Sequence, residues 1–127
     1  MGPADRPLRV LVVEDDVALA ELTAEVLRDD GTEVAVAHSL DEVRAAGTHG
    51  VTSDLALLDI NLGPGQPTGL EVYDWLAAHG FAGRLVFITG HATTNPLVRE
   101  AAAVPMATLL SKPYDVGRLL ELVQVPP

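Results

Sequence analysis

Cysteine is absent from this sequence, and basic residues are scarce in it. Without cysteine the chain can form no disulfide framework, no thiol nucleophile and no thiolate metal site. Its 8 Lys and Arg residues face 18 Asp and Glu residues, which gives a formal net charge of -10 at pH 7. Direct nucleic-acid binding needs the opposite, a basic surface, so we expect no nucleic-acid partner. The lack of cysteine fits a cytoplasmic protein, and this is the location we expect.

Long hydrophobic runs are absent too, although hydrophobic residues make up 48% of the chain. The N-terminus has no apolar segment of the signal-peptide type, and no apolar run exceeds about five residues, so we expect neither a signal peptide nor a membrane span. This hydrophobic content excludes a disordered acidic tail. The length of 127 residues suits one domain, and we expect its core over residues 8–124, with tails at 1–7 and 125–127.

Short apolar segments alternate five times with segments of helical periodicity. Capping residues precede several of the helical segments: Asp16, Asn95, and Ser39 in a capping box with Glu42. The alternation predicts an α/β fold, a doubly wound five-stranded parallel sheet in the flavodoxin-like order 2-1-3-4-5 with helices on both faces. The predicted strands are 10–13, 33–37, 55–59, 85–88 and 107–110, and the predicted helices are 17–30, 40–47, 69–78, 96–103 and 116–123.

Polar side chains follow four of the five predicted strands. Glu14 and Asp15 follow the first, Asp59 ends the third, Thr89 the fourth, and Lys112 follows the fifth. In the predicted strand order the crevice at the carboxyl edge lies between strands one and three, so three carboxylates should meet there. Such a cluster needs raised pKa values or a hard cation, and oxygen ligands favour Mg²⁺ or Mn²⁺. The lysine and the threonine suit an added anion, most simply a phosphoryl group.

Four short motifs give the chain a resemblance to a known family. They are Val12–Asp16 (VVEDD), Leu57–Asn61 (LLDIN), Ile88–Gly90 (ITG) and Lys112–Pro113. In this order and spacing, over nearly the whole chain, they resemble the receiver domains of two-component response regulators, as in chemotaxis receivers. The resemblance implies that Asp59 accepts a phosphoryl group from a sensor histidine kinase or a histidine phosphotransfer protein. An ionised aspartate is already a usable nucleophile and needs no general base.

The resemblance also implies a cofactor and its ligands. Mg²⁺, or Mn²⁺ in its place, would be bound directly by Asp15 and Asp59, and by Glu14 partly through water. The backbone carbonyl of Asn61 would complete the protein ligands. The cation would screen the repulsion between Asp59 and the incoming phosphoryl oxygens.

The remaining motif residues are implied to bind the phosphoryl group or to respond to it. Thr89 would be the switch hydroxyl, Gly90 would leave room beside it, and Lys112 would be the counter-ion. The Lys112–Pro113 peptide bond would be cis. His91, two residues after the threonine, would lie over the phosphorylation site and modulate hydrolysis of the acyl phosphate.

Three features depart from the family pattern. The loop between Asp59 and Gly69 is longer than usual, and Thr68 replaces the usual aspartate before that glycine. Leu109 stands where the family often has a tyrosine or phenylalanine that rotates with the switch hydroxyl. Residues 104–106, Val-Pro-Met, form an unusual approach to the last strand. We therefore expect altered partner coupling rather than lost phosphorylation.

Two other functions compete with the signalling module. A phosphorylation-independent interaction domain, or pseudo-receiver, would keep the fold alone. A Mg²⁺-dependent phosphatase with an aspartyl nucleophile commonly carries a second aspartate two residues later, where this chain has Asn61. We therefore expect no enzyme beyond self-phosphorylation and dephosphorylation. The sequence names neither the cognate kinase nor the output partner, predicts no membrane partner, and leaves a homodimer open.

Overall fold

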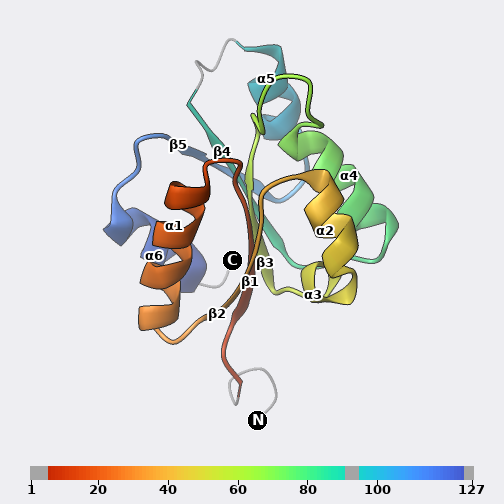
Figure 1. The fold of residues 1–127 in the computed structure, drawn as a ribbon. Coiled ribbons are helices and arrows are strands. Elements are labelled where there is room, and N and C mark those ends of the chain that lie inside the picture. The colour runs from red at the N-terminus through yellow and green to blue at the C-terminus, as the bar shows by residue number, and fades with distance from the viewer. Residues whose placement is uncertain (1–5, 91–94, 125–127) are drawn as a thin grey trace.

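A five-stranded parallel sheet forms the centre of the computed structural model, which describes residues 6–90 and 95–124 (Figure 1). Its strand order is β2-β1-β3-β4-β5, and all four strand pairs are parallel. The predicted order and class are therefore confirmed. The strands are β1 (Arg9–Val13), β2 (Glu33–Ala37), β3 (Leu55–Asp59), β4 (Arg84–Thr89) and β5 (Ala107–Ser111).

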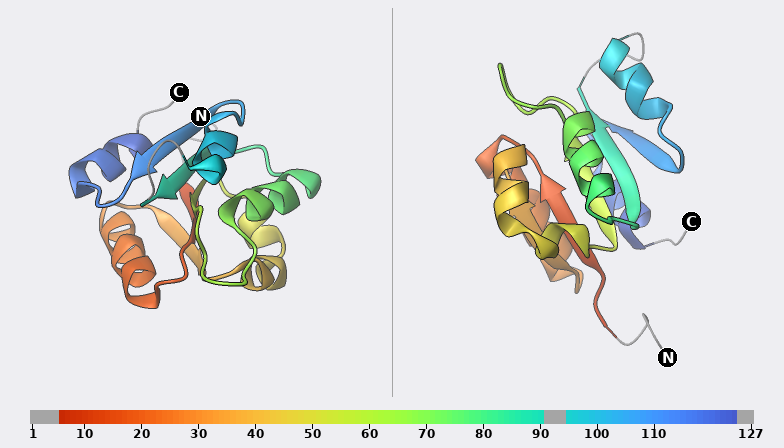
Figure 2. Two further views of the ribbon diagram at one scale, coloured as in Figure 1. Left: turned by 90° about the horizontal axis from the view of Figure 1, so that it is seen from above. Right: turned by 90° about the vertical axis from the view of Figure 1, so that its right-hand side faces the viewer.

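Helices cover both faces of the sheet, as predicted (Figures 1 and 2). On one face, α1 (Val17–Asp29) and α6 (Val116–Gln124) pack on a cluster that includes Val10, Val12 and Leu57. On the other face, the remaining helices pack on a second cluster that includes Leu11 and Leu58. Neighbouring strand residues thus point to opposite faces of the sheet, and both faces are buried beneath helices. The helices of this second face are α2 (Leu40–Ala46), α3 (Thr48–Val51), α4 (Gly69–Ala78) and α5 (Pro96–Ala102).

The short helix α3 is a difference from the sequence prediction, which had one helix ending at Gly47. The chain instead ends α2 at Ala46, turns at Gly47 with φ of 59°, and adds one further helical turn. Gly50 lets that turn lie close to β1, because a Cβ at this position would be 3.3 Å from a methyl group of Leu11. Four residues are too few to show helical periodicity in a sequence.

Helix caps largely follow the predicted pattern. The side chains of Asp16, Ser39 and Asn95 each accept a backbone N–H at the start of a helix. The predicted capping box at Ser39 is half formed, because the Glu42 carboxylate accepts the N–H of His38 rather than that of the cap residue. These caps satisfy donors that helix geometry leaves without partners.

Candidate functional site

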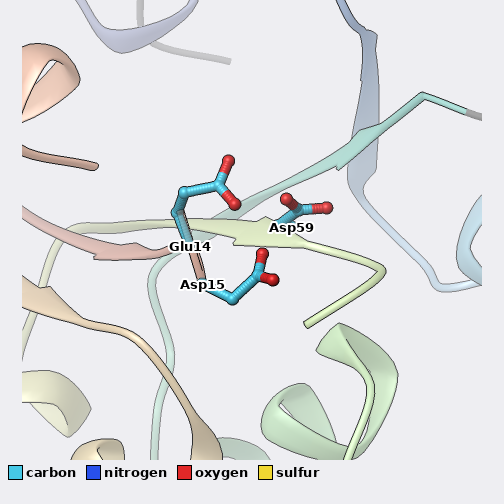
Figure 3. Close-up of side chains that lie close together, drawn as sticks. All are labelled: Glu14, Asp15 and Asp59. Carbon is cyan, nitrogen blue, oxygen red and sulfur yellow. The ribbon is translucent and has the colours of Figure 1, made fainter. Parts of the chain in front are cut away.

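Three carboxylates meet at the carboxyl edge of the sheet, where β1 and β3 lie side by side (Figure 3). Glu14 and Asp15 follow β1, and Asp59 is the last residue of β3. One oxygen from each carboxylate lies within 4.8 Å of the others. The side chains of Glu14 and Asp59 are buried, with exposed fractions of 6% and 3%, whereas Asp15 is exposed. The strand order has thus produced the acidic cluster that the sequence predicted.

Lys112 brings a positive charge into this cluster from the end of β5. Its Nζ lies 2.8 Å from Oε1 of Glu14 and 2.6 Å from Oδ2 of Asp59. The backbone N–H of Lys112 donates to the carbonyl of Thr89, and the Lys112–Pro113 bond is cis, as expected. Burial lowers the pKa of this ammonium, but its hydrogen bonds to Asp59 and Glu14 outweigh that effect and raise the pKa. Lys112 therefore stays charged at neutral pH.

The carboxyl groups of Glu14 and Asp15 both have raised pKa values. Burial raises the pKa of Glu14, and the nearby Asp59 carboxylate adds to the rise. Burial also raises the pKa of Asp15, and so does Glu14 beside it. One ammonium thus compensates the three carboxylates incompletely, and a divalent cation would relieve the remaining repulsion. A set of oxygen donors with this charge fits Mg²⁺ or Mn²⁺.

Asp59 is held by its own strand end and by the helix that follows. Its Oδ1 accepts the backbone N–H of Asn61 at 3.2 Å. The backbone of Ile60 donates to Ile88 and accepts from Gly69, which begins α4. A Cβ at Gly69 would collide with the carbonyl oxygen of Asp59, so glycine lets the helix start directly against the strand end. The carboxylate is therefore fixed from both sides of the loop.

Thr89 and Gly90 lie where β4 ends, next to β3. The threonine is buried, with an exposed fraction of 3%, and its register partner on β5 is Ser111. Gly90 is exposed, and a Cβ there would meet no atom within 4 Å. A side chain at this position would therefore enter open space, and the role of Gly90 in leaving room for a phosphoryl group stays a prediction.

Leu109 and His91 are the remaining positions that the sequence analysis singled out. Leu109 lies on β5 opposite Phe87 of β4 and packs, partly buried, against the core on the α4 and α5 side. An aliphatic side chain therefore occupies the place of the usual aromatic ring. His91 lies outside the described residues.

Comparison with known proteins decides the family. The family model of the response regulator receiver domain matches residues 10–124. This chain belongs to the response regulator receiver family. A search of curated proteins finds no match.

Solved structures agree with this receiver assignment. A CheY-like receiver domain from Methanospirillum hungatei is 26% identical, with a TM-score of 0.79, and 93% of this chain aligns with 91% of that one. NtrX from Brucella abortus, solved with ADP, is 28% identical with a TM-score of 0.79, but 91% of this chain aligns with 26% of NtrX. Chemotaxis protein CheY4 of Vibrio cholerae, at 24% identity and a TM-score of 0.77 over 93% of this chain and 97% of that one, shows the shared fold.

The long loop after Asp59 contains two successive turns in this receiver domain. Asn61 Oδ1 accepts the N–H of Gly63 at 3.0 Å, which forms an Asx turn. The carbonyl of Gly63 then accepts the N–H of Gln66, which closes a turn over Pro64 and Gly65, with φ of 74° at the glycine. The asparagine before a glycine-rich segment was the available signal. The loop projects from the carboxyl edge of the sheet, as the right-hand view of Figure 2 shows.

The loop ends on a capping box that the sequence analysis missed. The Thr68 hydroxyl accepts the N–H of Glu71, and the Glu71 carboxylate accepts the N–H of Thr68 at 2.7 Å. The spacing Thr-x-x-Glu was the available signal. Threonine therefore keeps the capping function that aspartate would have at this position, and this departure from the family pattern leaves the start of α4 intact.

Proposed function

We propose that this receiver domain is a phosphorylation-controlled signalling module in which Asp59 accepts the phosphoryl group. Receiver domains in general interact with histidine kinases or histidine phosphotransfer proteins and bind Mg²⁺ at an acidic pocket. The observation that carries the proposal is the contact of Lys112 with both Asp59 and Glu14, in a cluster of three carboxylates. Buried ionisable groups with shifted pKa values that gather at one strand end are typical of functional sites, and this supports the proposal.

The chemistry follows from the placement of these groups. An oxygen of Asp59 attacks the phosphorus of a phosphohistidine, the new O–P bond forms, and the P–N bond breaks with its electron pair left on the imidazole. Lys112 pairs with a phosphoryl oxygen, and the Thr89 hydroxyl donates to another. Gly90 borders the space that the phosphoryl group enters.

The cation would be Mg²⁺ or Mn²⁺, held by Glu14, Asp15, Asp59 and the backbone carbonyl of Asn61. When bound, it supplies positive charge that offsets the phosphoryl oxygens. The raised pKa values of Glu14 and Asp15 support this ligand set, because burial and, after it, the neighbouring carboxylates both disfavour the charged forms that a bound cation would stabilise. Turnover of unrelated phosphoesters is not expected, since Asn61 stands where an aspartyl phosphatase would carry its acid.

The outcome of phosphorylation would be a change in partner binding. We propose that the added charge on Asp59 draws Thr89 and Lys112 toward it and alters the surface around α5, β5 and α6. We also propose a cytoplasmic location. None of the helices in the described part of the chain has the length and apolar character needed to cross a bilayer.

The test is phosphorylation by acetyl phosphate with Mg²⁺, followed by intact-protein mass spectrometry. Wild type should gain one phosphoryl group that hydroxylamine removes, and Asp59→Asn should gain none. Asp54→Asn is the matched control, because this aspartate precedes the same strand at the opposite edge of the sheet. Equal modification of wild type and Asp59→Asn would refute the proposal and leave the pseudo-receiver as the better description.

A further inference from the structure

A hydrogen bond to one neutral side chain, that of Asn61, closes the turn after β3. Asn61 Oδ1 accepts the N–H of Gly63 at 3.0 Å, and the backbone N–H of Asn61 donates to Oδ1 of Asp59 at 3.2 Å. The side chain closes the turn while the backbone orients the carboxylate. Because both hydrogen bonds belong to the same residue, we expect a change that opens the Asx turn to disturb the N–H that holds Asp59 as well.

The same turn lies against a second carboxylate of the cluster. Gly63 has φ of 108°, and a Cβ built on it would be 3.5 Å from Oδ2 of Asp15. The turn at Gly63 thus lies beside Asp15, whose side chain is exposed, and a side chain at position 63 would touch that carboxylate. Glu14 is held differently, by Lys112 and by the N–H of Asp16 at 3.3 Å. The turn at 61–63 therefore holds Asp59 through a hydrogen bond and lies beside Asp15.

We propose that the Asn61 side chain is a positioning residue for the divalent cation. By closing the turn it keeps Asp59 and Asp15 in the arrangement that binds the cation, without contacting the cation itself. The inference rests on the proposed function, since it concerns the same acidic cluster. It adds a role for a side chain whose backbone alone was implied as a ligand.

The expected size of the effect comes from metal sites in general. Losing a group that orients a ligand typically weakens metal binding about 10- to 100-fold, and a neutral hydrogen bond in a half-exposed turn belongs at the lower end. We therefore expect the Kd for Mn²⁺ to rise about tenfold in Asn61→Leu, which keeps the branching at Cγ and removes the acceptor. Asn61→Ser retains a hydroxyl that can accept the same N–H, so its Kd should stay within about threefold of wild type.

A matched control exists elsewhere in the chain. Asn95 Oδ1 accepts the N–H of Leu97 at 2.9 Å, a hydrogen bond with the same two-residue spacing at the start of α5. Asn95→Leu therefore removes an equivalent bond away from the carboxylates, and its Kd should equal that of wild type. Free Mn²⁺ is measured by electron paramagnetic resonance and Mg²⁺ binding by calorimetry, with thermal denaturation in the absence of cations to verify folding.

Several results would overturn the inference. They are a Kd for Asn61→Leu within about twofold of wild type, an equal loss in Asn95→Leu, or a wild-type protein that binds no Mn²⁺. If Asn61→Leu fails to fold, Gly63→Ala supplies the second test, because φ of 108° disfavours alanine and should weaken binding as well. Failure of the proposed function is distinguishable: cation binding with these differences, but no phosphorylation of Asp59, would refute that proposal alone.

Discussion

Lys112 is the only lysine in the chain, and its replacement offers a direct test of how the site is balanced. We predict that Lys112→Met destabilises the fold at neutral pH. Methionine keeps a flexible apolar stem and removes the charge. Glu14 and Asp59, which are 6% and 3% exposed in the wild type, would then lose the ammonium that contacts both.

The magnitude follows from burial. Removing one partner of a fully buried ion pair costs about 3–5 kcal/mol of unfolding free energy. Here the Lys112 side chain is 28% exposed, and protonation of Glu14 relieves part of the repulsion, so we expect a loss of about 2 kcal/mol at pH 7. The pKa of Glu14 is higher in the folded protein than the ordinary glutamate value of 4.5. Ionisation of Glu14 therefore does not destabilise the fold below pH 4.5, and it destabilises the fold increasingly as the pH rises through the folded pKa. The deficit should therefore shrink from pH 7 to pH 5.

Urea denaturation followed by far-UV circular dichroism, without divalent cations, measures this loss. Lys112→Arg keeps the charge and should lose less stability than Lys112→Met. Arg118→Met is the surface control, because its 3.5 Å pair with Glu121 is exposed on both sides and should contribute less than about 1 kcal/mol. Unchanged stability of Lys112→Met at pH 7, or a deficit that grows on acidification, would show that Lys112 does not balance the carboxylates.

Three further predictions concern other parts of the chain. Met106 has φ of 68° and an exposed fraction of 85%, a backbone conformation that favours glycine. Met106→Gly should therefore raise the urea midpoint and increase the unfolding free energy by about 1 kcal/mol. An unchanged midpoint would exclude backbone strain at this position. Gly69→Ala should destabilise by about 1–3 kcal/mol because its Cβ meets the Asp59 carbonyl, whereas Gly90→Ala should leave stability unchanged; equal thermal melts would contradict this contrast. The hydrogen bond from Arg6 lowers the pKa of Asp54, so Asp54→Asn should lower the melting temperature at pH 7. The difference from wild type should disappear as the pH falls below 3.8, the ordinary pKa of an aspartate. A difference that stays constant with pH would argue against the ion pair.

The fold was predictable because each strand ends on a clear chemical boundary. Leu55–Asp59 is apolar up to its last residue, and the structure buries all five residues. Alternation of such strands with helical segments leaves few allowed topologies, since parallel crossovers are right-handed and neighbouring elements usually pack together. Helix α3 escaped prediction because its four residues are held by contact with Leu11, a contact between distant parts of the sequence.

The residues of the site were predictable from the sequence, but the backbone contacts that hold them in place were less predictable. Parallel strands bring their carboxyl ends to one edge, which placed Glu14, Asp59 and Lys112 together from order alone. The hydrogen bond from Gly63 to Asn61 and the close approach of Gly69 depend on backbone conformation, which a one-letter pattern specifies weakly. Arg6 shows the same limit, because its contact with Asp54 joins a predicted tail to the start of β3.

We predict that transmission of a signal from the site involves β5, the strand that directly precedes Lys112. Among the strands of the described residues, β5 lies at the edge of the sheet and pairs only with β4. An edge strand can shift with fewer broken ladder bonds than a central strand, so movement of Lys112 toward a new phosphoryl oxygen would displace β5 rather than β3. Leu109 lies three residues earlier on β5 and packs on the core beside α5, so the displacement reaches that helix through aliphatic packing. We therefore predict that coupling in this chain uses aliphatic packing at Leu109 in place of a rotating aromatic ring, and that Leu109→Ala weakens partner coupling without reducing phosphorylation of Asp59.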